Sequence, residues 1–294
     1  MTDETHMTSS QNNQLSLEMI ETRCTLCGSS NDKLLFEKEG FRHVCCQTCG
    51  LVYVNPRLKF HKDFQTVSGT GSMGDDQLSR LQILRICKEL SMLDNYRKLN
   101  RILEIGPGKG WFLSIAKLVG WETWAMEINL DAIENLKRKN INNIITSGSV
   151  ISGSGHESFD VIRMWDVIEH LEWPRALLEE IFNSLRSGGL LRLSTTNINS
   201  LSRMVNGPEW VYLNGSDHIV LFDPVTIDKL LKLVGFRRIR IRTRSFNLRR
   251  KLYHPEREIK VKFHPLRPFR KIIDETIKFT NFGHQMIVDA VKEA

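Results

Sequence analysis

The stretch that decides the fold is Leu103-Glu104-Ile105-Gly106-Pro107-Gly108-Lys109-Gly110, in which three glycines occupy alternate positions. Residues 101–105 read as a short strand and residues 111–119 as the helix that follows it. Glycine permits a tight strand-to-helix turn, and its missing Cβ lets a ligand approach the backbone. Seventeen positions after the last glycine, Glu127 ends the next apolar run, where its carboxylate can accept hydrogen bonds from ribose hydroxyls. The sequence therefore predicts a nucleoside-binding turn.

The spacing of the glycines separates this turn from a dinucleotide site, which carries G-x-G-x-x-G and holds a pyrophosphate at a helix N-terminus. Here the pattern is E-x-G-x-G-x-G, and the carboxylate of Glu104 would repel a pyrophosphate but suits a ligand with an ammonium group. The pattern resembles motif I of the class I S-adenosylmethionine (SAM) methyltransferases. That resemblance implies that Glu127 binds the ribose of SAM. It also implies that four residues of the turn frame the methionine end: Glu104, Gly106, Gly108 and Gly110.

A second family signature follows the fourth predicted strand, residues 159–165. There the chain reads Trp165-Asp166-Val167-Ile168-Glu169-His170-Leu171 and then Trp173-Pro174. In a doubly wound sheet, the carboxyl end of this strand borders the ligand crevice. The stretch resembles the corresponding motif of ubiquinone-biosynthesis-like methyltransferases (types 11, 13 and 23), including a subgroup with an N-terminal zinc ribbon. The resemblance covers roughly residues 23–236 and implies that Asp166 faces the sulfonium side of SAM.

Strands and helices alternate from residue 99 onward. Besides the ranges above, the pattern predicts strands over 121–126, 141–146, 190–195, 238–244 and 287–292, and helices over 130–139, 174–186 and 225–234. Such alternation favours an α/β fold with a doubly wound, mostly parallel sheet. The resemblance implies the seven-stranded, Rossmann-like sheet of class I methyltransferases.

Residues 147–157 are rich in serine and glycine and are expected to form a loop. Many members of the resembled family place an acid after strand three to bind the adenine of SAM. This chain instead reads Ser147-Gly148-Ser149-Val150, so backbone groups or Ser149 are the expected adenine contacts.

Five of the six cysteines lie within 26 residues near the N-terminus. Cys24, Cys27, Cys46 and Cys49 give the spacing C-x2-C-x18-C-x2-C, which suits two knuckles that donate four thiolates to one tetrahedral Zn²⁺. Four thiolates leave no open coordination position, so the metal should be structural. Zinc would supply the folding energy that a module of ~30 residues lacks. Cys45 adjoins Cys46 and stays open as the alternative ligand.

Methyl transfer needs in-line alignment and removal of a proton from the acceptor, and histidine suits that proton transfer near neutral pH. Two candidate bases are His170 and His218, the latter in Gly215-Ser216-Asp217-His218, where the resembled family closes its site. Zinc-ribbon sugar C-methyltransferases use a Glu-His pair at a position resembling Asp217-His218. Some quinone-pathway relatives bind a divalent cation through a stretch resembling residues 166–170. A hydrogen-bonded structural role is the alternative for each histidine.

The net charge of +7 is unevenly distributed. Residues 237–271 contain fourteen Lys and Arg against two Glu, and within them Arg238, Arg240, Arg242 and Arg244 share one face of a period-2 strand. Such a row protects an edge strand from pairing, or it serves an anionic substrate such as a sugar nucleotide, a membrane surface or RNA. Aromatic residues are sparse in the segment, which disfavours RNA.

The chain divides into four predicted segments: a disordered polar tail over 1–22, a zinc ribbon over 23–54, a linker and amphipathic helix over 55–98, and a SAM-binding domain over 99–294 with a basic insertion at about 246–282. The helix of the third segment carries Leu78, Leu81, Leu84, Leu90 and Leu93 near helical spacing, and Cys87 is expected in its core face. The polar first 22 residues and the lack of an apolar run near ~20 residues favour a cytoplasmic protein. The basic segment leaves peripheral membrane contact open.

These observations predict a SAM-dependent methyltransferase with SAM as cofactor and a structural zinc. The expected acceptor is an oxygen, and less favourably a carbon, of an anionic small molecule or glycan precursor. The alternatives are an RNA methyltransferase that uses the basic segment, and a catalytically inactive binding module tethered by zinc. The sequence does not predict the oligomeric state.

Overall fold

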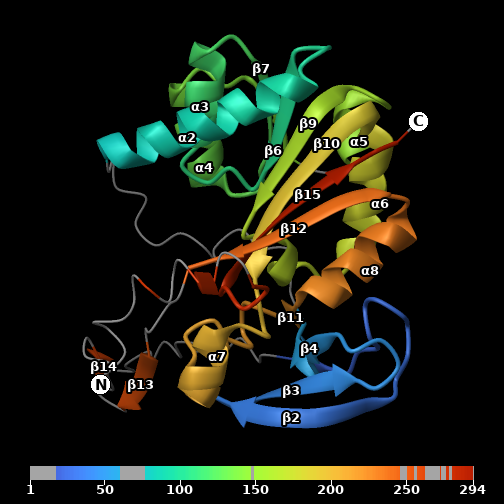
Figure 1. Cartoon of the computed structure of the whole chain (residues 1–294), viewed down its shortest axis with the longest axis vertical. Helices are drawn as coiled ribbons and strands as arrows, with labels where there is room; N and C mark the ends of the chain where they lie inside the picture. The colour runs from blue at the N-terminus through green and yellow to red at the C-terminus, as the bar shows by residue number, and fades with distance from the viewer. Residues whose placement is uncertain are drawn as a thin grey trace, which may run out of the picture.

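The computed structural model describes residues 18–59, 77–146, 149–245, 250–254, 257–261, 272, 276–277 and 280–293. Within them, a seven-stranded sheet flanked by helices stands above a four-stranded sheet built mainly from the N-terminal segment (Figure 1). Among the described residues, no helix is long and apolar enough to span a bilayer.

The large sheet has the order β12-β15-β10-β9-β6-β7-β8. Its strands are β6 (Arg101–Ile105), β7 (Glu122–Met126), β8 (Asn143–Ile145), β9 (Phe159–Trp165), β10 (Leu185–Thr196), β12 (Arg238–Arg244) and β15 (Gln285–Val291). Strand β15 runs antiparallel to β10 and β12, and the other pairs are parallel. The strand order reverses at β6, which places a ligand crevice at the carboxyl ends of β6 and β9. The prediction of a doubly wound, mostly parallel sheet is confirmed.

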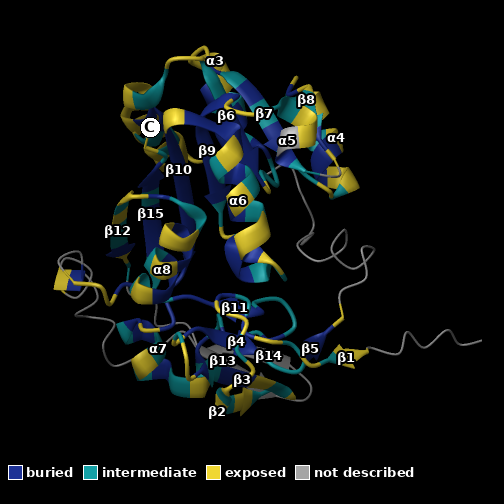
Figure 2. Ribbon diagram, turned by 90° about the vertical axis from the view of Figure 1, so that its right-hand side faces the viewer, coloured by how far each residue is buried: buried dark blue, intermediate teal, exposed yellow. Residues whose placement is uncertain are grey.

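Helices cover both faces of this sheet. Helices α2 (Arg80–Leu93), α3 (Trp111–Leu118) and α4 (Leu130–Arg138) share a buried cluster with alternate residues of the strands, such as Ile102 and Val161. Helices α6 (Pro174–Ser184) and α8 (Pro224–Val234) pack on the opposite face. Figure 2 shows that burial is concentrated in the strands between these two layers.

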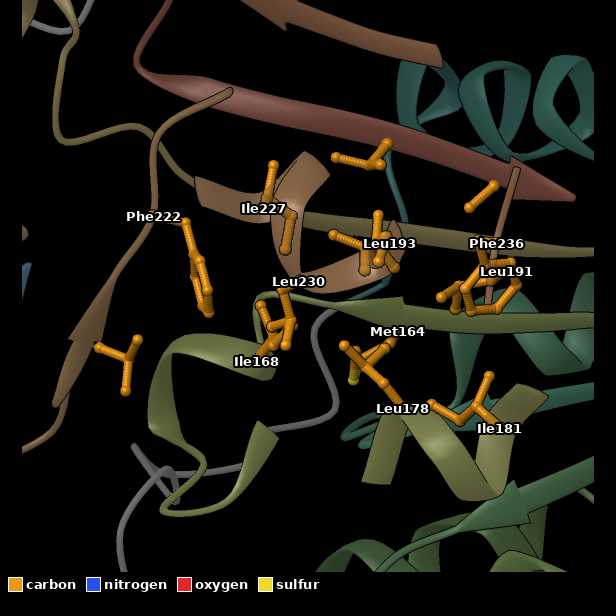
Figure 3. Close-up of a cluster of buried hydrophobic side chains, with 14 of the residues drawn as sticks. Met164, Ile168, Leu178, Ile181, Leu191, Leu193, Phe222, Ile227, Leu230 and Phe236 are labelled. Atoms are coloured by element: carbon orange, nitrogen blue, oxygen red, sulfur yellow. The ribbon is translucent and has the colours of Figure 1, made fainter. Parts of the chain in front are cut away.

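The core beneath α6 and α8 is built from hydrophobic side chains (Figure 3). Met164, Leu191 and Leu193 project from β9 and β10 toward the two helices, and each is fully buried. Leu178 of α6 and Leu230 of α8 meet them from the helix side. Burying a side chain of this size contributes roughly 1.5–3 kcal/mol, so this face needs no charged groups to be stable.

The small sheet joins the N-terminal segment to the larger domain. Its order is β11-β4-β3-β2, from β2 (Asp32–Lys38), β3 (Phe41–Cys46), β4 (Val52–Val54) and β11 (Val220–Leu221). Strand β11 belongs to the chain between β10 and α8, yet Val220 pairs with Tyr53 and Leu221 with Val52. All four residues are buried. The cysteine-bearing segment is therefore part of the larger domain and not an independent module. This pairing was not predicted from the sequence.

Short elements connect the larger ones. They are α7 (Leu201–Asn206) and the 3₁₀ turns η1 (Asp94–Tyr96), η2 (Ile168–His170) and η3 (Gly207–Glu209). Strands β13 (Arg250–His254) and β14 (Arg257–Val261) pair with each other, and the rest of the predicted basic insertion lies largely outside the described residues.

Two N-terminal expectations meet the structure only in part. Of the predicted tail, residues 1–17 lie outside the described residues, but β1 (Met19–Ile20) pairs with β5 (Arg57–Leu58). Of the predicted linker, residues 60–76 also lie outside them.

Residues 147–157 were expected as a loop, and this is wrong for their centre, where α5 (Val150–Ser154) forms. The side chain of Ser149 accepts a hydrogen bond from the backbone N–H of Ser152, as a helix cap does, and Val150 is fully buried. Serine and glycine suited a cap as well as a loop, so composition alone misled the interpretation. Ser149, an expected adenine contact, serves here as that cap.

The predicted amphipathic helix is α2, shorter than the pattern suggested. Leu90 and Leu93 are buried, but Leu81, Leu84 and Cys87 are exposed, so the expected core position of Cys87 is wrong. Most of the length of α2 lines a pocket, and the buried residues of the helix lie only near its C-terminal end.

Candidate active site

The glycine turn follows β6 and packs closely against two neighbours. A Cβ on Gly106 would lie 2.7 Å from Val167 Cγ2, and one on Gly110 would lie 2.6 Å from Leu136 Cδ2. Both residues also have positive φ, at 65° and 69°. Glycine is therefore required at both positions by packing and by backbone conformation. A Cβ on Gly108 would meet no described atom within 4 Å, so the middle of the turn is open to a ligand.

Glu127 connects the end of β7 to this turn. Its Oε1 accepts hydrogen bonds from the N–H groups of Ile128 and Asn129 at 2.9 and 3.0 Å, and its Oε2 accepts one from Gly108 at 3.4 Å. The carboxylate is thus held at the carboxyl edge of the sheet beside the open part of the turn. Its remaining lone pairs suit the two hydroxyls of a ribose.

Glu104 lies beneath the turn on the face covered by α2 and α3, and it is buried. Its Oε1 forms an ion pair with Nη1 of Arg163, while its Oε2 is buried and accepts no hydrogen bond from any described residue. Burial raises the pKa of Glu104 to about 7, although the charge of Arg163 opposes this rise. An unsatisfied buried acceptor beside the glycine turn fits a ligand that brings an ammonium donor, as SAM does.

A cavity of about 190 Å³ lies at the carboxyl ends of β9 and β10. Its lining residues are Asp166, Glu169, Thr196, Tyr212, His218, His284 and Gln285. Asp166 comes directly after β9, and its Oδ1 accepts hydrogen bonds from Ser194 at 2.6 Å and Gln285 at 3.3 Å. The cavity therefore adjoins the crevice where the strand order reverses.

The two candidate bases lie side by side, with His218 in the wall of this cavity and His170 against the His218 ring. The ring centroids of His170 and His218 are 4.8 Å apart, and the rings are nearly perpendicular. Nδ1 of His170 donates to the carboxylate and the carbonyl of Asp217, each at 2.9 Å. Nδ1 of His218 donates to the carbonyl of Tyr212 at 3.0 Å. In its neutral form, His218 therefore carries its proton on Nδ1 and presents Nε2 as an acceptor.

The electrostatic surroundings give the two histidines opposite charge states. Burial, followed by the positive charge of His170, lowers the pKa of His218 to about 4. Burial alone would lower the pKa of His170 too, but the hydrogen bond to Asp217 and the charges of Glu169 and Asp217 raise it to about 9. At neutral pH the site thus contains an imidazolium beside a neutral imidazole. Such separated pKa values in two adjacent side chains are typical of acid–base sites.

The four cysteines of the knuckles come together as one cluster. The Sγ atoms of Cys24, Cys27, Cys46 and Cys49 all lie within 4.8 Å of one another. The backbone N–H of Gly28 donates to the carbonyl of Cys24 at 2.8 Å, and that of Gly50 donates to Cys46 at 2.9 Å, so the same turn occurs twice.

Cys45 lies outside this cluster. Its Sγ donates instead to the carbonyls of Cys46 and Gly50, each at 3.7 Å, so Cys46 is the residue that joins the other three cysteines. Four thiolates in this arrangement fit a structural Zn²⁺ and leave no place for a water or substrate.

Residues 79–241 match a family model described as a methyltransferase domain. The chain belongs to this methyltransferase family. The expectation of a class I SAM methyltransferase with a Rossmann-like sheet is confirmed at the level of family and fold.

Individual proteins resemble the chain at lower levels of sequence identity, from 17% to 28% in the three cases that follow. The mitochondrial ubiquinone biosynthesis O-methyltransferase of Schizosaccharomyces pombe is 28% identical over 142 residues, covering 45% of this chain and 50% of that protein. The chain thus spans about half the length of this curated relative. A SAM-dependent methyltransferase from Archaeoglobus fulgidus is similar in structure, with a TM-score of 0.49, 22% identity and coverage of 71% of this chain and 93% of that one. A methyltransferase from Thermotoga maritima described as a possible histamine N-methyltransferase has a TM-score of 0.45, 17% identity and coverage of 71% and 89%.

The methyltransferase brings its predicted site residues to one edge of the sheet, but one pairing was not predicted. Asp217 binds His170, which is 47 residues away, and its sequence neighbour His218 uses the carbonyl of Tyr212 instead. Tyr212 and His284 were not predicted at all, although both line the cavity and their rings stack 5.7 Å apart. No local pattern marks these two residues, because they reach the cavity through contacts between distant segments.

Replacing Glu127 by alanine should weaken the affinity of this methyltransferase for SAM by roughly tenfold or more, because charge-assisted hydrogen bonds to the ribose are lost. Calorimetric titration with SAM measures the change. Glu122→Ala is the matched control, since Glu122 begins the same strand and pairs with Arg101 at the opposite edge. Equal SAM affinity in the two variants would show that Glu127 does not bind the ribose.

Proposed function

We propose that this protein transfers a methyl group from SAM to a hydroxyl oxygen of a small molecule or glycan precursor, with His218 as the general base. The observation that carries the proposal is the neutral His218, whose Nδ1 proton is engaged by the carbonyl of Tyr212 and whose ring lines the cavity beside Asp166. SAM, when bound, supplies an activated methyl group on a sulfonium. Glu104, Glu127 and the glycine turn would hold it.

The chemistry required of the protein is then alignment and proton removal. As the acceptor oxygen gains the methyl group, its proton passes to Nε2 of His218. The imidazolium of His170, with its ring centroid 4.8 Å from that of His218, stabilises negative charge on the acceptor oxygen. A base with a pKa near 4 is weak, so the pair suits an acidic hydroxyl, such as a phenol or enol, better than an ordinary alcohol.

One carboxylate, that of Asp217, positions this pair directly. Asp217 orients His170 through two contacts to Nδ1 and keeps it protonated. Glu169 is fully buried, and its Oε2 accepts a hydrogen bond from Thr195 at 2.9 Å. The similar Schizosaccharomyces pombe protein is named as an O-methyltransferase, which supports oxygen as the acceptor atom.

A second interpretation of the same residues is a divalent cation, since ligand atoms of Glu169, His170 and His218 lie within 4.8 Å of one another. The hydrogen bonds of both Nδ1 atoms and the proton on His170 favour the acid–base interpretation. Methyl transfer that is abolished by a chelator and restored by Mg²⁺ alone would favour the cation.

His218→Ala should lower the rate of methyl transfer by about 10²- to 10⁴-fold, because the general base is lost, while the affinity for SAM stays the same. The assay follows labelled methyl from SAM into a small-molecule extract of the source cells. His156→Ala, which changes an exposed histidine outside the cavity, is the control. An unchanged rate in His218→Ala would exclude the base, and label in a nuclease-sensitive polymer would favour RNA as the acceptor.

The pH dependence tests the role of His170. The site works with His218 neutral and His170 protonated, so the rate should be flat near neutral pH and fall as pH rises through about 9. Asp217→Asn removes a carboxylate that raises the pKa of His170, so the alkaline limb should move down by roughly 1–2 pH units. Asp131→Asn, at an exposed position on α4, should leave the limb in place. If the alkaline limb does not move in Asp217→Asn, the contact between Asp217 and His170 has no role in catalysis.

We also propose that the four-cysteine cluster holds a structural Zn²⁺. Cys27→Ser should lose the metal and slow methyl transfer by about tenfold or more, because β4 would no longer fix β11 and His218, and misplacement by about 1 Å is costly to catalysis. Cys45→Ser, next to the cluster, should keep both zinc and activity. Atomic absorption and the methyl-transfer assay measure the two effects. Retained zinc in Cys27→Ser, or full activity without zinc, would overturn the assignment.

A further inference from the structure

A row of alternating charges crosses the sheet beneath α2. Nε of Arg163 and Nε of Arg192 both bind Oε1 of Glu89 at 3.0 Å, and Nη2 of Arg242 binds Oδ2 of Asp289 at 2.7 Å. Arg192 also pairs with Asp289, and Arg163 with Glu104. The row thus runs from the glycine turn to the edge strand in this order: Glu104, Arg163, Glu89, Arg192, Asp289 and Arg242.

Buried ion pairs of this kind are weak evidence for a role in stability alone. Two arginines of the row follow apolar residues of the α2 and α3 face at a spacing of two: Arg163 follows Val161, and Arg192 follows Leu190. Side chains of Arg163 and Arg192 are only 9% and 7% exposed. Replacing buried ion pairs by apolar residues is commonly neutral or stabilising, and on the opposite face of the same strands Ile162, Met164 and Leu191 are apolar. A role in binding gives these buried arginines a reason to be there.

Beside the row lies a pocket of about 560 Å³, which we call the basic pocket. Six cationic side chains and one carboxylate line it: Arg85, Lys88, Arg163, Arg192, Arg242, Arg244 and Glu89. The row neutralises part of this charge. Arg85, Lys88 and Arg244 form no salt bridge with any described carboxylate, and Nε of Arg242 is buried without a hydrogen-bond partner in the described part of the chain. The basic pocket therefore has an excess of positive charge.

The basic pocket also has an apolar wall, to which Trp165, Ile86 and Ile287 contribute. The guanidinium carbons of Arg163 and Arg244 lie 4.2 and 5.7 Å from the Trp165 ring centroid. A volume of this size takes a whole small-molecule portion, not only a single ion. Its chemistry fits an anionic group attached to an aromatic or apolar body.

The basic pocket and the histidine cavity share a wall. Trp165 lines the pocket, and the next residue, Asp166, lines the cavity. Nε of Arg244 donates to Oε1 of Gln285 at 3.0 Å, and Gln285 also lines the cavity. The basic pocket and the histidine cavity are therefore direct neighbours, on either side of the Trp165–Asp166 step and the Arg244–Gln285 contact.

We propose that the basic pocket binds a carboxylate or phosphate group of the acceptor, whose hydroxyl then lies at His218. This inference rests on the proposed function for the identity of the ligand as the acceptor. Arg85 and Arg244 would supply direct contacts. The row of ion pairs would fix Arg163, Arg192 and Arg242 around them.

The test uses the double variant Arg85→Gln/Arg244→Gln, which leaves the buried row intact. Arg240→Gln is the matched control, because Arg240 lies on β12 on the same face but is exposed and outside the basic pocket. Thermal unfolding is followed with added pyrophosphate, and separately with benzoate, against sodium chloride of equal ionic strength. At least one anion should stabilise the wild type and Arg240→Gln, and the double variant should bind it roughly tenfold more weakly or worse. The proposal that the basic pocket binds an anion would be overturned if neither anion stabilised the wild type, or if the double variant bound the anion equally well.

A second measurement separates the pocket from the proposed function. Labelled methyl from SAM should enter a product that an anion-exchange resin retains, and the double variant should raise the KM for the acceptor by roughly tenfold or more with SAM affinity unchanged. Methyl transfer to an unretained product, at equal rates in both proteins, would overturn the acceptor assignment while the methyltransferase activity stands. Weakened SAM binding in the double variant would also overturn it, since the pocket would then hold the carboxylate of SAM. Arginine-dependent anion binding with no methyl transfer would support the anion site and contradict the proposed function.

Discussion

The pairing of β4 with β11 is the constraint on which the rest of the site depends. His218 lies two residues before β11, and the N–H of Val54 donates to the carbonyl of the intervening Ile219 at 2.9 Å. Ile219 in turn donates to the carbonyl of Glu169 at 3.0 Å, so one short strand fixes both histidine-bearing segments. A Cβ on Gly215 would lie 2.4 Å from Cβ of Phe41, so the loop before His218 also presses against the cysteine-bearing sheet. The four-cysteine cluster thus acts on the site through backbone geometry.

Much of the large domain could be predicted because its signals are local. Each signal is contained in a short stretch of sequence: the glycine turn, the alternation of strands and helices, and the spacing of the cysteines. Strand β11 was not predicted because it has only two residues, too few to show the alternation of polar and apolar residues that marks a strand. Its partner strand also lies about 170 positions earlier in the sequence. The bond between Asp217 and His170 escaped prediction because 47 residues separate the two, and adjacency in sequence does not decide which side chains pair. Helix α5 was missed because its cap residues are also loop residues.

The arginine strand shows how a correct pattern can carry an incomplete meaning. Its alternation predicted that Arg242 and Arg244 share one face of the strand, and the structure has Ile239 and Ile241 on the other face, packed against the core. Protection of a sheet edge explains exposed arginines such as Arg238. Edge protection does not explain why Arg242 forms an ion pair with Asp289 of β15, because an arginine that only blocks edge pairing can stay in solvent. That distinction needs the positions of residues from α2, β9, β10 and β15 together, which no single stretch of sequence contains.

If the proposed function holds, two groups bind the acceptor: His218 at its hydroxyl and the basic pocket at its anionic group. Each is fixed by the fold. His218 is fixed by β11 and the small sheet, and the basic pocket is fixed by strands of the large sheet. Methyl transfer requires the acceptor oxygen to approach the methyl carbon in line and within about 3–3.5 Å. Two rigid anchors set the separation between the hydroxyl and the anionic group of a productive acceptor. A molecule with both groups at another separation can satisfy one anchor only, so selection among acceptors follows from the distance between the anchors as well as from charge.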